Sequence, residues 1–198
     1  MPDTGAPWNI PYVAGTDLVA DWPTDSETLA NAIADGLDDA GKIVQIVSTV
    51  KTDTFSTTSS SFVDVTGLSV TLTPASASNK VLLIAQVTWG FSGTTNSGFY
   101  LKFDGGNTSS YVGDTAGSRI RAVYGGITVP GAGELNGVAR AYSMVYLDSP
   151  ATAASVIYKV QAGASTAYPV YINRSYADVD SANVTRGASS ITAVEVKG

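Results

Sequence analysis

The stretch FVDVTGLSVTLT at residues 62–73 decides the fold class. Its apolar side chains Leu68, Val70 and Leu72 alternate with serine and threonine, so one face is apolar and the other polar. A period of two residues is that of a β-strand over a core, because successive side chains point to opposite faces of a sheet. The stretch therefore predicts a half-buried strand in an antiparallel sheet.

The same alternation recurs from residue 42 to the end of the chain, with turn residues such as Thr66-Gly67 and Pro130-Gly131 between the segments. About ten short strands with almost no helix between them favour a sandwich or barrel over a parallel βαβ fold. We predict an all-β, antiparallel jelly-roll β-sandwich over residues 42–198. Its other strands are expected near residues 43–47, 61–65, 79–91, 97–104, 109–113, 119–128, 137–148, 154–162, 168–174 and 189–197.

Two of these strands are apolar on both faces. In residues 80–91, Leu82 and Ile84 lie opposite the apolar residues at odd positions, and in residues 139–147, Val145 and Leu147 lie opposite the tyrosines. A sandwich strand normally has one face in water, so a second apolar face indicates burial against another element or subunit. We therefore expect a homotrimer, in which copies of the chain cover these faces.

A short helix should precede the β-domain, in a segment formed by residues 24–41 with a linker. The Thr-x-x-Glu spacing of residues 24–27 is that of a capping box and predicts a helix over about residues 25–39. A helix of about four turns is marginal alone in water. It either packs on its own β-domain or meets copies of itself about a symmetry axis. We assign its apolar stripe to oligomerisation: Leu29, Ala32, Ile33 and Leu37.

Residues 1–23 form a third segment, which is rich in proline and in apolar side chains and keeps no helical or strand period. We predict an extended N-terminal anchor that docks on another protein or subunit, because disordered tails are usually poor in aromatic and branched apolar residues. The side chains assigned to anchoring and assembly are Trp8, Ile10, Tyr12, Leu18 and Trp22.

Composition excludes most catalytic designs. The chain has no Cys and no His, which removes Cys nucleophiles, Ser-His-Asp triads and the usual zinc sites. A net charge of −6 argues against nucleic acid as a partner, and no apolar run is long enough for membrane insertion. We expect a non-enzymatic protein without cofactor or metal, whose acids, such as Asp64, Asp104, Asp114, Glu134 and Asp148, face solvent.

Two sets of charged residues near the C-terminus are candidates for chemistry. Asp178 and Asp180 have the spacing of two carboxylates on one face of an extended segment, but calcium needs six to eight oxygen ligands, and a solvated loop is the preferred interpretation. Arg174, Arg186 and Glu195 lie beside strand-like residues, and we predict a structural ion pair among them.

Turn and tyrosine residues complete the candidates. Asp104-Gly105-Gly106-Asn107 resembles a phosphate loop but lacks the following Lys-Ser/Thr and helix, so it predicts a hairpin turn. Several of the ten tyrosines lie in or next to predicted turns. They fit either an adaptable binding surface for a glycan or a cover over the core at strand ends.

Three parts of the chain carry a resemblance: PYVAGTDLVADWP at 11–23 with SETLA at 26–30, then TDTFST at 52–57 with FVDVTGLSVTLTP at 62–74 and SNKVL at 78–82, and finally VYINRS at 170–175 with RGASSITAVEV at 186–196. The first resembles the start of bacteriophage tail-fibre and minor structural proteins, and the other two resemble the first strands and the close of a β-domain frequent in phage virion proteins. The resemblance implies a trimeric jelly roll like that of the complement and tumour-necrosis-factor family, carried on a virion appendage, whether of the tail, neck, baseplate or capsid, and anchored to other virion proteins by its N-terminus.

Two other functions stay open beside the virion fibre. A carbohydrate-binding adhesin module of cellular origin fits the β-domain, but it would not need the apolar first 23 residues. A polysaccharide depolymerase would need paired acids in a cleft, whereas Asp and Glu are scattered here.

Overall fold

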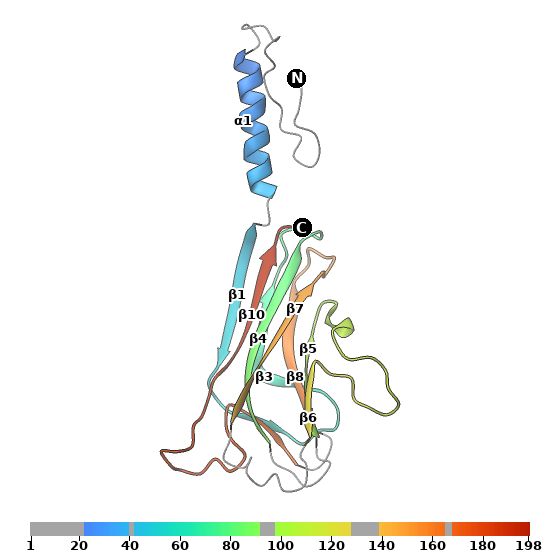
Figure 1. Cartoon of the computed structure of the whole chain (residues 1–198), viewed down its shortest axis with the longest axis vertical. Coiled ribbons are helices and arrows are strands. Elements are labelled where there is room, and N and C mark those ends of the chain that lie inside the picture. Colours follow the sequence, from blue (N-terminus) through green and yellow to red (C-terminus); the bar gives the residue numbers. More distant parts are fainter. Residues whose placement is uncertain (1–21, 40–41, 92–97, 128–138, 165–167) are drawn as a thin grey trace. The chain divides into compact units, whose positions relative to one another are not determined.

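The computed structural model describes residues 22–39, 42–91, 98–127, 139–164 and 168–198 (Figure 1). The chain divides into two compact units. The first is residues 1–42 with Lys197, and the second is residues 43–196 with Gly198. Each unit is described by itself.

The first unit contains one helix among its described residues, α1 (Trp22–Asp39), which begins three residues before the predicted start. Thr24 lies inside it and accepts a hydrogen bond at its backbone oxygen from Thr28 Oγ1 at 2.8 Å, while Ser26 Oγ donates to the Pro23 oxygen at 2.9 Å. The predicted capping box is therefore wrong. Pro23 fits the first turn of a helix, because the amide that proline lacks has no partner there in any helix.

The second unit is an antiparallel β-sandwich with jelly-roll topology, so the predicted fold class is confirmed. The first sheet has β1, β10, β4 and β7 side by side, and the second has β3, β8, β5 and β6 in that order; β2 and β9 extend the first sheet. The strands are β1 (Ile43–Lys51), β2 (Phe55–Thr57), β3 (Val63–Leu72), β4 (Lys80–Phe91), β5 (Gly98–Asp104), β6 (Tyr124–Ile127), β7 (Arg140–Asp148), β8 (Val156–Ala164), β9 (Val170–Ile172) and β10 (Ser189–Val196).

The core lies between the two sheets and follows the alternation seen in the sequence. Leu68, Val70 and Leu72 of β3 are all buried, as their spacing predicts, and they meet Leu83 of β4 and Val160 of β8 in one apolar cluster. Burial of apolar surface is the main favourable term in folding such a domain.

The segment between β5 and β6 differs from the prediction. Residues 109–113 form no strand; instead a short 3₁₀ helix, η2 (Thr108–Ser110), follows the turn at residues 104–107. The predicted strand at 119–128 is shorter and begins only at Tyr124. Between η2 and β6 the chain makes a loop, whose base is closed by a hydrogen bond from Gly113 N to Ala122 O at 3.2 Å.

The register of the strands shows at which end of the sandwich each connection lies. Ile43 pairs with Val196 and Val196 with Lys80, so the chain enters the β-domain at the end where β10 finishes and β4 starts. The short turns at 73–79, 104–107 and 149–155 lie at this entry end (Figure 1). The long connection between β9 and β10, residues 173–188, lies at the opposite end.

Candidate functional site

The outer face of the first sheet is the most unusual surface of the β-domain. Cross-strand pairing aligns its side chains in rows that run from β1 across β10 and β4 to β7. One row is Ile46, Val194, Leu82 and Leu147, and the next is Ser48, Thr192, Ile84 and Val145. Ile46 is 60% exposed, and Leu147 and Val145 are each 49% exposed. We call these two rows the apolar face.

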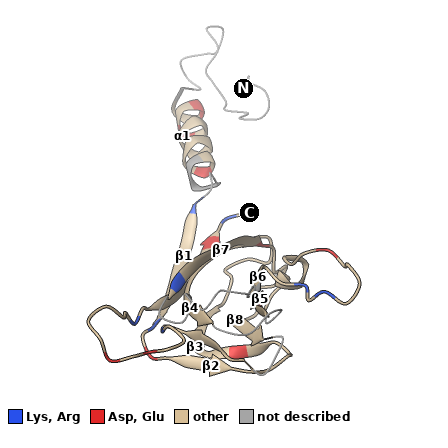
Figure 2. Ribbon diagram, turned by 60° about the horizontal axis from the view of Figure 1, so that its bottom comes forward, with Lys and Arg blue, Asp and Glu red and all other residues tan. Residues whose placement is uncertain are grey.

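The apolar face is nearly free of charge, in contrast to the outer face of the second sheet. In the described strands of the first sheet, Lys80 at the start of β4 is the one charged residue at a position that points to the outer face. The second sheet presents Asp64, whose carboxylate accepts hydrogen bonds from Lys159 Nζ at 2.8 Å and Gln161 Nε2 at 2.7 Å. Elsewhere the charged residues gather mainly in loops and near strand ends (Figure 2).

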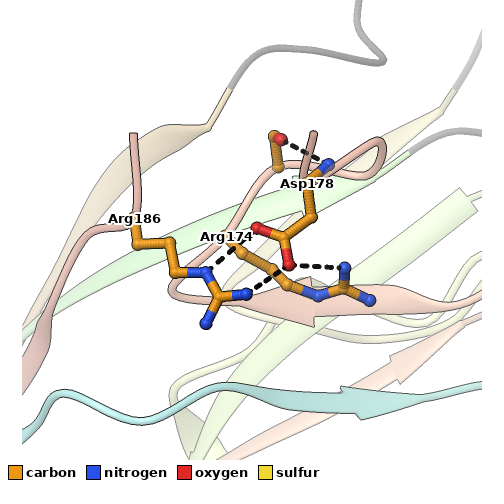
Figure 3. Close-up of polar contacts among 4 residues, drawn as sticks. Arg174, Asp178 and Arg186 are labelled. Carbon is orange, nitrogen blue, oxygen red and sulfur yellow. Dashed lines mark hydrogen bonds and ion pairs between the residues drawn. The ribbon is translucent and has the colours of Figure 1, made fainter. Parts of the chain in front are cut away.

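Arg174 and Arg186 form ion pairs, but with Asp178 and not with Glu195 as predicted. Arg186 approaches the Asp178 carboxylate through Nε at 3.0 Å and Nη2 at 2.6 Å, and Arg174 Nη1 lies 3.2 Å from Oδ2 (Figure 3). The Arg174 guanidinium also lies over the Tyr171 ring, 3.8 Å from its centroid. The assignment of Glu195 as partner is therefore wrong.

This cluster also shows what the Asp178 carboxylate, one of the two acids considered for calcium, contacts in the structure. The hydrogen bond from Arg186 is the largest influence on the pKa of the Asp178 carboxyl; burial opposes it, but together with the charges of both arginines it holds this pKa below its usual range. Its oxygens are thus occupied by arginine donors. Within the described residues, no group of three or more acids is placed to hold a metal ion.

Glu195 is instead a fully buried carboxylate held by neutral donors. Oε1 accepts hydrogen bonds from Ala75 N at 2.7 Å and Asn79 Nδ2 at 2.6 Å, and Oε2 accepts one from Gln45 Nε2 at 2.5 Å. Burial raises the pKa of Glu195, but the hydrogen bonds together outweigh it and leave the pKa below its ordinary value. Glu195 thereby links β10 to β1 and to the turn before β4.

The expectation that the acids named from the sequence face solvent is wrong for Asp148. It is fully buried and accepts hydrogen bonds from Tyr158 Oη at 2.7 Å and from Asn107 N at 3.2 Å. Burial, and then the contact with Asp148, raises the pKa of Tyr158. Because Asn107 belongs to the predicted hairpin turn, Asp148 fixes that turn at the entry end.

Asn173 joins several elements and was missed by the sequence analysis. Its side chain is fully buried: Nδ2 donates to the Lys51 and Asp53 oxygens at 2.8 and 2.9 Å, and Oδ1 accepts from Ser189 Oγ at 2.6 Å. Its backbone has φ 66°, in the left-handed region that Asn tolerates better than most residues. The signal available in the sequence was an Asn directly after the strand VYI, at a chain reversal.

The tyrosines next to turns mainly cover the core. Tyr111 stacks on Tyr146 of β7 with ring centroids 4.6 Å apart, and Tyr124 stacks on Tyr142 at 3.6 Å. Tyr100 is 5% exposed and its hydroxyl donates to backbone oxygens. The two stacked pairs join the β5–β6 segment to β7, whereas Tyr100 packs against Phe62 instead.

Most of the assigned anchor residues lie outside the described residues: Trp8, Ile10, Tyr12 and Leu18. Trp22 begins α1. In the predicted helix stripe Leu29 and Ala32 are half-buried, whereas Ile33 is exposed. Leu37 belongs to α1, and its side chain is outside the described part.

No model of a known protein family matches the chain, and no curated protein matches it. Among the described residues, no helix has the length and apolar character needed to cross a membrane.

Proposed function

We propose that the protein is a non-enzymatic structural subunit of a virion, a trimeric phage fibre or spike. Its N-terminal segment would anchor it to other virion proteins, and its β-domain would be exposed for assembly or host-surface adhesion. The proposal joins the resemblance of the three sequence stretches to the character of the apolar face. A carbohydrate-binding adhesin is the alternative with the same surface chemistry.

The observation that carries the proposal is the apolar face. Large exposed apolar patches on soluble domains mark contact surfaces, and a face shared by identical copies must be self-complementary or meet a neighbour around a ring. Rows of valine, leucine and isoleucine, joined by Ser48 and Thr192 and without charge, suit such contact, since no buried charge would need a partner. The charged outer face of the second sheet suits solvent instead.

The substitution Val145→Glu tests assembly, with Ile157→Glu as its matched control. Each residue is 49% exposed in the β-domain, but Val145 lies on the apolar face and Ile157 on the outer face of the second sheet. A trimer of Val145→Glu would bury one new carboxylate per subunit, each costing several kcal/mol. We expect wild type and Ile157→Glu to be trimers and Val145→Glu a folded monomer by native mass measurement. A monomeric wild type, or a trimeric Val145→Glu, would contradict the proposal.

Removal of residues 1–23 tests the anchor. The truncated protein should retain the trimeric β-domain, because every described core residue lies after residue 42, but it should fail to enter virions. Incorporation is measured by supplying full-length or truncated protein to particles assembled without it and probing the purified particles. Equal incorporation of both forms would place the attachment elsewhere in the chain.

The absence of enzymatic activity is part of the proposal and rests on how the carboxylates are used. General acid–base catalysis near neutral pH would need an Asp or Glu with a raised pKa in contact with a substrate. Glu195 and Asp178 both have lowered pKa values, and the oxygens of Asp148 accept protein donors. These three acids therefore support structural roles.

A further inference from the structure

A groove lies on the outer side of the second sheet, beside β6 and the loop that precedes it. Its volume is about 520 Å³, within the range of small-ligand sites. The floor includes Gly98, Gly125 and Gly126, and the wall includes Asp114, Arg119 and Arg121. Neither the apolar face nor the Asp178 cluster contributes a residue.

The two arginines are held in place by their own loop. Arg121 Nε donates to Gly113 O at 2.7 Å and Arg119 Nη1 donates to Ala116 O at 3.2 Å. Each bond uses one of the five N–H donors of a guanidinium, so most donors remain for a ligand. Because these long side chains are already positioned, less rotamer freedom is lost when a ligand binds.

The strand residues that line the groove are Gly98, Gly125 and Gly126 together with Phe99 and Tyr100. Gly125 pairs with Tyr100, whose side chain is not part of the apolar core cluster, whereas a Cβ at Gly126 would lie on the core side, 2.7 Å from the Phe99 ring. In the described part of the second sheet, β6 is the edge strand, paired on one side with β5. Backbone polar groups at an open strand edge are available to a ligand rich in hydroxyl groups.

The charges of the wall select an anionic ligand. Two guanidinium groups stand against the single carboxylate of Asp114, in a chain whose net charge is −6. The planar fork of arginine matches a carboxylate with two parallel hydrogen bonds. Ile120, 52% exposed in the same wall, adds an apolar surface for the carbon face of a ring.

We propose that this groove binds an acidic saccharide, with a uronate-type carboxylate at Arg119 and Arg121 and a sugar ring against Tyr100 and the neighbouring glycines. The inference deepens the proposed adhesive role and rests on it. It names acidic surface polysaccharide as the class of receptor and the β5–β6 side of the domain as the contact.

Titration calorimetry of the full-length protein tests the site, with trigalacturonate as probe and galactotriose as its neutral counterpart. We expect trigalacturonate to bind at least tenfold more tightly than galactotriose, a difference of about 1.4 kcal/mol. Arg119→Gln with Arg121→Gln should weaken binding at least tenfold. Arg140→Gln, which removes an exposed charge outside the groove lining, should leave it unchanged.

Asp114→Asn keeps both arginines and removes the opposing charge. It should therefore tighten trigalacturonate binding about two- to threefold. The inference is overturned if trigalacturonate does not bind at millimolar concentration, if the neutral sugar binds equally well, if Asp114→Asn weakens binding, or if inorganic phosphate at equal ionic strength binds as tightly. Native mass measurement of the same samples separates the outcomes: a trimer that fails to bind disproves this site and leaves the proposed assembly intact.

Discussion

Asn173→Ala is expected to lower the free energy of unfolding by about 3 to 4 kcal/mol. The substitution leaves the Lys51 and Asp53 oxygens and the Ser189 hydroxyl, which Asn173 bonds in the folded protein, without that partner. It also places alanine at φ 66°, which costs roughly 1 kcal/mol more than for glycine. The change is measured by urea unfolding followed by tryptophan fluorescence.

Two variants separate the causes of this loss. Asn173→Gly avoids the backbone strain of alanine at this φ but does not restore the lost side-chain hydrogen bonds. It should therefore be about 1 kcal/mol more stable than Asn173→Ala. Asn183→Ala changes an exposed Asn in the same connection and should alter stability by less than about 0.5 kcal/mol. Equal unfolding midpoints for Asn173→Ala and Asn183→Ala would show that Asn173 does not hold the strands together.

Glu195→Gln is expected to lower the free energy of unfolding by about 3 kcal/mol at neutral pH. The NH₂ group of a glutamine side chain would face N–H donors, from which the carboxylate now accepts hydrogen bonds. Rotation of the Gln45 amide does not solve this, because Gln45 Nε2 also donates to the Thr73 oxygen at 2.8 Å. Asp180→Asn, which removes an exposed negative charge, should have little effect.

The dependence on pH gives a second test of Glu195. Its pKa is lower in the folded chain than its ordinary value, so the carboxylate stabilises the fold fully above about pH 5 and loses this contribution as the pH falls through the folded-state pKa. Wild type should therefore lose stability more steeply than Glu195→Gln on acidification, and the two curves should converge once the carboxyl is protonated in both folded and unfolded chains. Parallel curves over the acidic range would contradict the assignment.

The fold was predictable because the apolar side chains that alternate along the strands in the sequence are the ones that form the core. The burial of two acids was also present in the sequence: Glu195 has the parity of Ile191 and Ala193 in β10, and Asp148 that of Met144 in β7. The sequence analysis nevertheless placed these acids in solvent, because burying an isolated charge is costly. The donors that remove the cost could not be predicted.

Those donors are distant in the chain. Asn79 and Gln45 lie more than a hundred residues before Glu195, and alternation along a strand does not say which distant turn packs against it. The Asp178 cluster was missed for a different reason. Arg174 and Asp178 are four residues apart in a loop, where no regular period relates side chains, and Arg186 reaches them only because β9 and β10 bring both ends of the loop together.

In the proposed assembly, the near absence of charge on the apolar face would also determine the response to solvent. Screening by salt weakens contacts between charges but has little to act on here, whereas sulfate and similar salts strengthen apolar burial. Since apolar association weakens on cooling, subunits joined by this face would separate more readily in the cold than in warm solution. An appendage built this way would tolerate brackish surroundings and would be most vulnerable to prolonged chilling at high dilution.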